Sequence, residues 1–221
     1  MTVTDVNVVK SAIFERPDDA NKGTLGSLLC VCGSYGMAGA AVMSAKGALR
    51  TGIGLAKCAL PRSIYPIVAQ TILESVYYPL SENADGRISK VNVPFLVSES
   101  CKSSATLVGC GLGVCDDTLK IVFSFIENST TPLVLDADAL NCVAKQPEIL
   151  LRKKAPIIIT PHPGEMSRLT GLATPLVNAE RERVALDFAQ KYGVVTVLKG
   201  AGTVIASPNG KVLVNPTGNS G

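Results

Sequence analysis

A histidine and a glutamate three positions apart are the residues best suited to chemistry, in the segment Thr-Pro-His-Pro-Gly-Glu over 160–165. His162 is the only histidine of the 221 residues. The apolar residues 157–159 before it predict a buried strand, and a helical pattern begins near Pro163. At a strand-to-helix turn, an imidazole and a carboxylate can face a ligand, as polar groups do in open α/β sheets. The alternative is that His162 and Glu165 only cap the helix.

Two glycine-rich turns offer backbone rather than side-chain chemistry. Glycines recur over 33–39 and over 109–113, each time after an expected strand. Glycine lets a ligand approach the backbone closely, and a helix beginning at Ala40 would offer its free amides to an anion. The spacing matches neither the dinucleotide fingerprint G-x-G-x-x-G nor the phosphate loop with its Lys-Ser/Thr. Each segment can equally be a simple turn.

Charged residues end two further strands. Asp136 and Asp138 could hold a metal or a hydroxyl, or they could cap a helix expected over 139–144. Lys199 precedes Gly-Ala-Gly-Thr, so a cation, backbone amides and a hydroxyl lie within the five residues 199–203. This combination is suited to a nucleotide phosphate. The ordinary alternative is a hairpin with a solvated lysine.

These motifs need a sheet that brings the strand ends together. Short apolar strands alternate with helical stretches, which predicts an α/β fold with a largely parallel sheet and helices on both faces. The carboxyl ends of parallel strands meet at one edge, so the five motifs are expected to share it. Expected strands are 26–32, 53–60, 75–78, 106–108, 132–135, 157–160 and 194–198, with a hairpin of 204–206 and 211–214; expected helices include 40–50, one opening at Pro61, 116–127 and 178–192.

Composition excludes several classes of function. The net charge of +3 is small and the basic residues are scattered, so nucleic acid is not an expected partner. The first residues lack the pattern of a signal peptide, and no apolar stretch is long enough to span a bilayer, so no membrane role is expected. Seven cysteines without a Cys-x-x-Cys pair indicate reduced, buried thiols and a cytoplasmic protein. The length fits a single α/β domain over 1–221.

The ordered set of motifs resembles the ADP-dependent NAD(P)H-hydrate dehydratases, a branch of the ribokinase-like fold. The resemblance covers nearly the whole chain and implies a three-layer sandwich. The motifs that carry it are Lys22-Gly23, Gly33-Ser34-x-Gly36-x-x-Gly39-Ala40, Ala48-Leu49-Arg50-x-Gly52-x-Gly54-Leu55, Gly109-x-Gly111-Leu112-Gly113, Leu135-Asp136-Ala137-Asp138-Ala139-Leu140-Asn141, Thr160-Pro161-His162-Pro163-Gly164-Glu165 and Lys199-Gly200-x-x-Thr203.

The resemblance implies an enzyme that repairs NADH or NADPH hydrated at the 6-position of the nicotinamide ring (NADHX or NADPHX). It would use ADP, or ATP in some members, with Mg²⁺ to phosphorylate the hydroxyl, giving AMP from ADP, and loss of phosphate would restore the cofactor. By position, Glu165 would help to hold Mg²⁺. A homo-oligomer, often a tetramer, is implied as well. The dinucleotide would contact Ala40, Gly113 and His162, and the nucleotide would contact Lys199, Gly200, Ala201, Gly202 and Thr203.

The family continues beyond the point that corresponds to Gly221 into a Gly-Gly-x-Gly-Asp segment, whose aspartate serves the reacting hydroxyl. The expectation from the resemblance is therefore a C-terminally incomplete domain, with no catalytic residue identified among these 221 residues. Two other interpretations remain open at this point. One is a small-molecule kinase of the same fold, such as a hydroxyethylthiazole-type kinase. The other is a catalytically inactive nucleotide-binding remnant.

Overall fold

The computed structural model describes residues 2–3, 10, 20 and 23–218. In this part of the chain ten strands form one sheet, in the order β1-β10-β9-β8-β7-β6-β5-β2-β3-β4. Neighbours from β4 to β8 are parallel, whereas β9 runs antiparallel to both β8 and β10. The strands are β1 Thr2–Val3, β2 Ser27–Val31, β3 Leu55–Pro61, β4 Val76–Leu80, β5 Ala105–Val108, β6 Leu133–Leu135, β7 Ile157–Ile159, β8 Val195–Leu198, β9 Thr203–Ala206 and β10 Val212–Asn215.

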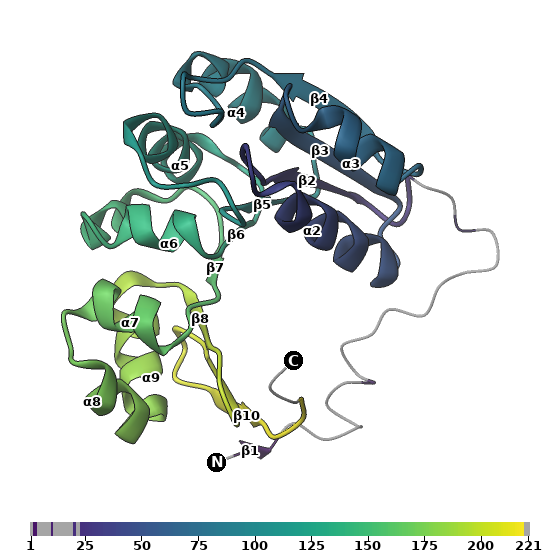
Figure 1. Cartoon of the computed structure of the whole chain (residues 1–221). Coiled ribbons are helices and arrows are strands. Elements are labelled where there is room, and N and C mark those ends of the chain that lie inside the picture. The colour runs from purple at the N-terminus through teal and green to yellow at the C-terminus, as the bar shows by residue number, and fades with distance from the viewer. Residues whose placement is uncertain (1, 4–9, 11–19, 21–22, 219–221) are drawn as a thin grey trace.

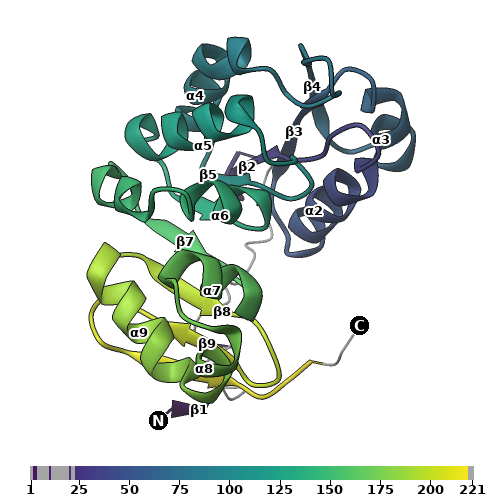
Figure 2. The same ribbon diagram turned by 60° about the vertical axis from the view of Figure 1, so that its left-hand side comes forward.

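Helices lie on both faces of this sheet (Figure 1), so the predicted α/β class is confirmed. Helices α2 and α3 pack on one face, and the remaining helices pack on the other, where α7, α8 and α9 cover β8 and β9 (Figure 2). The helices are α2 Ala38–Arg50, α3 Tyr65–Thr71, α4 Val93–Cys101, α5 Asp116–Asn128, α6 Asp138–Val143, α7 Pro163–Thr170, α8 Thr174–Ala179 and α9 Arg181–Tyr192, with 3₁₀ turns at Lys90–Asn92 and Pro147–Arg152.

Strand β2 shows how alternation divides the core into two clusters. Leu29 and Val31 point into the larger cluster, beneath α4 to α9. Cys30 and Cys32 point the other way, into a smaller cluster beneath α2 and α3. All seven cysteines are free, and burial raises the pKa of the Cys30 thiol because a thiolate there would lose its hydration. The thiols near β2 therefore behave mainly as small apolar groups.

Two predicted helix boundaries are wrong. Pro61 ends strand β3 instead of opening a helix, and Pro66 occupies the first turn of α3. The helix expected over 178–192 is two helices, because Glu180 leaves the helical conformation with φ −124° and ψ 39°. Apolar spacing cannot show this break, whereas the structure shows Arg181, the first residue of α9, bonded to Leu198 O at the end of β8.

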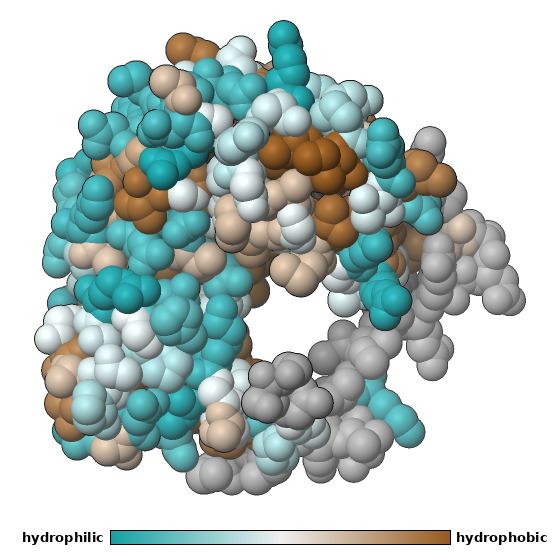
Figure 3. Space-filling model, viewed as in Figure 1, coloured by the Kyte–Doolittle hydropathy of each residue, from teal (hydrophilic) through white to brown (hydrophobic). Residues whose placement is uncertain are grey.

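The face that carries α2 and α3 is only partly covered in the described part of the chain. Side chains of β6 to β9 on that face, including Val134, Ile158, Val197 and Ile205, remain partly exposed. The space-filling view shows further hydrophobic side chains over α2 and α3 (Figure 3), a region where Met43 and Ile67 are exposed. None of the helices in the described residues is long and apolar enough to cross a membrane. Of the motifs behind the resemblance, Lys22 lies outside the described residues.

Candidate active site

The turns after β2, β5, β6, β7 and β8 meet at one edge of the sheet. Their backbones are joined directly: Gly33 N donates to Cys110 O at 2.8 Å, and Lys199 N donates to Pro161 O at 2.8 Å. Strands β7 and β8 are parallel neighbours, so His162 and Lys199 follow adjacent strand ends. The five motifs therefore lie at the same edge, as predicted from their positions after strands.

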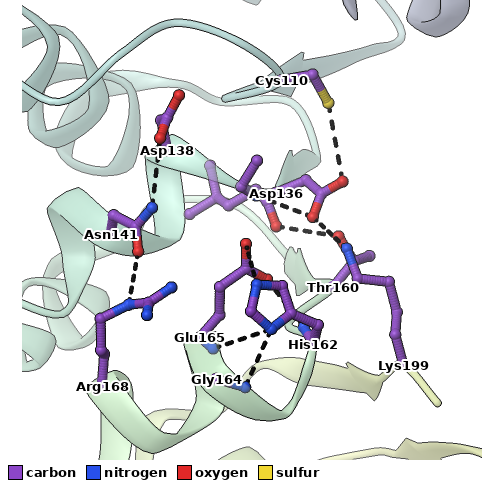
Figure 4. A network of polar contacts seen from close by, with 12 residues as sticks. Cys110, Asp136, Asp138, Asn141, Thr160, His162, Gly164, Glu165, Arg168 and Lys199 are labelled. Atoms are coloured by element: carbon purple, nitrogen blue, oxygen red, sulfur yellow. Dashed lines mark hydrogen bonds and ion pairs between the residues drawn. The ribbon is translucent and has the colours of Figure 1, made fainter.

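His162 is the N-cap of α7, and it forms a capping box with Glu165. The His162 Nδ1 atom accepts hydrogen bonds from Gly164 N at 3.0 Å and Glu165 N at 3.4 Å. In return, Glu165 Oε2 accepts from His162 N at 2.8 Å. The other carboxylate oxygen, Oε1, lies 3.3 Å from His162 Nε2 (Figure 4). The ring is half exposed whereas the glutamate side chain is buried, so the imidazole is the group that can reach a ligand.

The cap can be tested apart from any ligand. We expect His162→Ala to destabilise the fold by about 0.5–2 kcal/mol, because two helix amides lose their acceptor. His162→Asn should retain most of that stability, since asparagine is among the best N-cap residues. Urea unfolding followed by circular dichroism measures both values. Equal losses in the two variants would contradict the capping role.

Asp138 connects the turn after β5 to α7. Its Oδ2 atom accepts from Gly113 N at 2.8 Å, and its Oδ1 atom accepts from Asn141 Nδ2 at 3.3 Å. Asn141 Oδ1 in turn accepts from Arg168 Nε at 2.8 Å (Figure 4). The idea that the aspartates cap α6 is wrong, because the N-cap residue is Ala137 and the helix has no side-chain capping hydrogen bond. Asp138 instead fixes the backbone of Gly113.

Lys199 forms an ion pair with Asp136 across the ends of β8 and β6. The Lys199 Nζ and Asp136 Oδ1 atoms are 2.7 Å apart, with the lysine side chain 41% exposed and the aspartate 25% exposed. Asp136 Oδ1 also accepts from Ala137 N at 2.9 Å, and Oδ2 accepts from the Cys110 thiol at 3.8 Å. The aspartate is thus held on several sides. The ammonium group of Lys199 points toward this carboxylate (Figure 4).

Cys110 differs from the other thiols near β2 because its pKa is lowered. The chief cause is the hydrogen bond from the Cys32 thiol, which stabilises the thiolate of Cys110. The hydroxyl of Ser44 and the cation of Lys199 act in the same direction, while burial and Asp136 oppose them. The thiol also borders a groove, so it is both accessible and activated.

We expect Cys110 to react with iodoacetamide at lower pH than an ordinary thiol. Only the thiolate is nucleophilic, so a lowered pKa moves the midpoint of the rate–pH curve below that of an ordinary thiol. Cys32→Ala removes the main stabilising hydrogen bond and should move that midpoint upward. Peptide mass spectrometry after timed alkylation resolves Cys110 from the buried Cys30. A midpoint for Cys110 at or above that of an ordinary thiol would contradict the assignment.

The loop 199–203 presents free backbone donors. In the described part of the chain, the amide groups of Gly200, Ala201 and Gly202 have no hydrogen-bond partner. The Thr203 hydroxyl donates to Gly200 O at 3.2 Å, which closes the loop on itself. Three successive unpaired amides beside Lys199 are donors suited to an anion.

A groove of about 520 Å³ runs between α2 and the partly covered face, and it reaches the edge that carries the motifs. Its polar end is formed by Asp136, Thr160 and Lys199, and its floor includes the apolar side chains of Leu107 and Val134. Ala40 does not line this groove but packs against the turn at Gly111. On the far side of the 199–203 loop lies a second pocket of about 560 Å³, lined in part by Ala201 and Gly202.

No ready-made metal cage is present in the residues that the structure describes, since no three His, Cys, Asp or Glu side chains cluster suitably. The Glu165 carboxylate already contacts His162 through both oxygens. Mg²⁺ commonly binds through one or two carboxylates, waters and substrate phosphates. The described residues therefore suit a magnesium ion that arrives with a nucleotide better than one held by a protein cage.

The arrangement defines a ribokinase-like protein. A ribokinase-like superfamily protein from Enterococcus faecalis shares the fold with a TM-score of 0.82 at 20% identity, covering 99% of this chain and 72% of that one. The crystal structure of the Bacillus subtilis ADP/ATP-dependent NAD(P)H-hydrate dehydratase, co-crystallised with ATP/Mg²⁺, gives 0.81 at 30% identity, covering 99% and 73%.

Sequence comparison narrows the class to one family. The NAD(P)H-hydrate dehydratase family matches residues 28–221, so the chain belongs to that family. The bifunctional NAD(P)H-hydrate repair enzyme Nnr of Thermofilum pendens is 39% identical over 206 residues, which is 93% of this chain and 39% of that protein. The chain thus spans about two fifths of the length of the bifunctional relatives it matches. The resemblance inferred from the motifs is confirmed.

Some residues at the edge were not predicted from the sequence. Asn141 and Arg168 join Asp138 to α7, and Arg181 lies behind the 199–203 loop. The spacing of Asp138 and Asn141 on one helix was a usable signal, because residues three apart share a helix face. Arg181 carried no such signal, since its partners are backbone atoms 17 and 21 positions away.

Proposed function

We propose that the protein dehydrates (6S)-hydrated NADH and NADPH in a nucleotide-dependent repair reaction, as the family name of its relatives indicates. The observation that carries the proposal is the 199–203 loop, with Lys199 and three unpaired amides, on the same edge as His162 and Gly113. A phosphate cradle beside a polar turn is what phosphoryl transfer to a bound hydroxyl requires.

The chemistry explains why a nucleotide is needed. Hydroxide is a poor leaving group, so the reaction moves the terminal phosphoryl group of ADP to the 6-hydroxyl and leaves AMP. The phosphate then departs with the electrons of the carbon–oxygen bond, the adjacent ring carbon loses a proton, and dihydronicotinamide is restored. The protein must align the two substrates and stabilise the charge on the transferring group.

Each residue has a proposed role in this alignment. Lys199 and the amides of Gly200, Ala201 and Gly202 receive the phosphates, and the Thr203 hydroxyl supports them. The half-exposed imidazole of His162 contacts the hydrated dinucleotide. The backbone at Gly113 and the start of α2 at Ala40 complete the same side of the site.

Mg²⁺ is the proposed cofactor, and it would neutralise phosphate charge when bound. Glu165 is its proposed protein partner, through water, because the glutamate is buried beside His162 at the edge. Glu165 also accepts a hydrogen bond from His162 N, which keeps the imidazole at the start of α7.

The test is an assay of the protein that carries this sequence with NADHX, ADP or ATP, and Mg²⁺. We expect dihydronicotinamide absorbance to return, with one AMP formed for each cofactor restored when ADP is used. Phosphorylation of a hydroxyethylthiazole without any recovery of NADH would favour the small-molecule kinase. Binding of ADP without either reaction would favour the inactive nucleotide-binding protein.

The cellular location, the oligomeric state and the domain organisation of the protein are also proposals. Seven free cysteines, four of them buried, suit the reducing cytoplasm. We propose a homo-oligomer, a tetramer being the expected form, and a single-domain organisation for the 221 residues, on the basis of the family resemblance. Light scattering after size-exclusion chromatography measures the oligomeric state.

A further inference from the structure

Arg181 lies directly behind the 199–203 loop and holds both of its ends. The Arg181 Nη2 atom donates to Leu198 O at 2.8 Å and reaches Gly202 O at 3.4 Å. Leu198 is the last residue of β8, and Gly202 directly precedes β9. A single guanidinium therefore connects the two points between which the loop is formed.

The guanidinium also packs against the loop backbone at Gly200. This glycine has φ +153°, and a Cβ atom built on it would lie 2.7 Å from Arg181 Nη1 and 2.8 Å from Nη2. No side chain fits there without displacing the arginine. The carbonyl groups of Leu198 and Gly202 point toward Arg181. The amides of Gly200, Ala201 and Gly202 have no hydrogen-bond partner in the described part of the chain.

The charge of Arg181 lacks a counter-ion among the described residues. No carboxylate oxygen there lies within ion-pairing distance of its guanidinium, whereas Arg183 on the same helix pairs with Glu180. The buried Nε atom of Arg181 has no hydrogen-bond partner either. Burial lowers the pKa of the guanidinium, yet at neutral pH an arginine keeps its proton. An uncompensated cation beside free amides favours an anion on the other side of the loop.

We propose that Arg181 is a positioning residue for the nucleotide: it fixes the carbonyls of Leu198 and Gly202 so that the loop amides face the phosphates, and its charge adds to theirs. The inference rests on the proposed nucleotide-binding role of the loop. In this proposal Arg181 itself does not contact the substrate. Its partner Gly200 is required for the close approach of the guanidinium.

The experiment compares Arg181→Met, which removes the charge and both hydrogen bonds, with Arg181→Lys, which keeps the charge but not the fork-shaped donor. Arg183→Met is the matched control, because it removes an exposed arginine two positions away on the same helix. ADP affinity is measured by calorimetry. Hydrogen exchange of the loop is measured without ligand at the Lys199 amide, which donates to Pro161 O and belongs to the peptide group whose carbonyl Arg181 holds. Thermal unfolding of each variant accompanies both measurements.

We expect ADP affinity to fall about ten- to a hundredfold in Arg181→Met and less in Arg181→Lys, as for the loss of charge-assisted hydrogen bonds. Exchange at the hydrogen-bonded amide of Lys199 should accelerate in both variants and stay unchanged in Arg183→Met. Unchanged affinity and exchange in the Arg181 variants would overturn the inference. A lower melting temperature with unchanged affinity and loop exchange would also overturn it, since the residue would then be merely structural.

Two further outcomes are decisive. If Arg181→Met does not fold, the result for Arg181→Lys tests the proposal. Wild-type ADP affinity and wild-type loop exchange in Arg181→Lys would show that the hydrogen bonds from Arg181 to Leu198 O and Gly202 O do not position the loop. If the wild-type protein binds no ADP, the proposed function fails. The exchange measurement then still tests whether Arg181 orders the loop, so the two failures can be told apart.

Discussion

Replacing Gly109 by alanine is expected to destabilise the protein more than any other single change considered for it. Gly109 has φ +129°, and a Cβ atom there would lie 1.9 Å from Asp136 O and 2.8 Å from Ala139 Cβ. The backbone strain costs about 1–3 kcal/mol. The overlap costs about 1–3 kcal/mol more because the obstructing atom is backbone. The total approaches the whole stability of many domains, about 5–15 kcal/mol.

Gly47→Ala is the matched control for this prediction. Gly47 lies inside α2, it does not have a positive φ, and an added Cβ would meet nothing within 4 Å. Alanine there should stabilise the helix by about 0.5–1 kcal/mol. Urea unfolding of both variants gives the two free energies. Near-wild-type stability of Gly109→Ala would show that the turns after β5 and β6 do not approach as closely as described.

Replacing Lys199 by methionine is expected to have the largest effect on activity. The lysine is the cation of the loop, and its ammonium group is held 2.7 Å from Asp136 Oδ1. Its removal deletes positive charge at the proposed phosphate site and leaves the Asp136 carboxylate there without its partner. We expect the rate of NADHX dehydration to fall about 10²–10³-fold, as for loss of one preorganised donor. ADP affinity should fall less, about ten- to a hundredfold.

Two comparisons separate this effect from simple loss of the ion pair. Lys211→Met removes an exposed lysine just before β10 and should change neither rate nor affinity. The double variant Lys199→Met with Asp136→Asn removes the unpaired carboxylate. It should regain stability but not activity. Recovery of full activity in the double variant would show that Lys199 serves only to neutralise Asp136.

Much of the fold follows from local pattern. Apolar runs such as Ile157–Ile159 mark strands within a residue or two, and Pro163 marks the start of α7. These signals are local because backbone geometry and solvent exclusion act on neighbouring residues. The sequence also predicted that the motifs lie at one edge of the sheet, because the carboxyl ends of parallel strands meet there.

Other features were ambiguous for a physical reason. His162 and Glu165 could be read as ligand groups or as caps, and the structure shows the capping box with a half-exposed ring. An imidazole that caps a helix through Nδ1 can still be half exposed, so residue type cannot decide between the two interpretations. The break at Glu180 was missed because both helices keep apolar spacing across it.

The sequence by itself determined the family, the alternating α/β plan and which turns carry polar groups. Only the tertiary structure decided how those groups pair. The Lys199–Asp136 ion pair joins residues 63 positions apart, and Asp138 meets Gly113 across 25. Arg181 reaches carbonyl groups, which every residue type possesses, so no pattern of side chains reveals it. Such contacts depend on strand order and helix placement, which are set by the packing of the whole core.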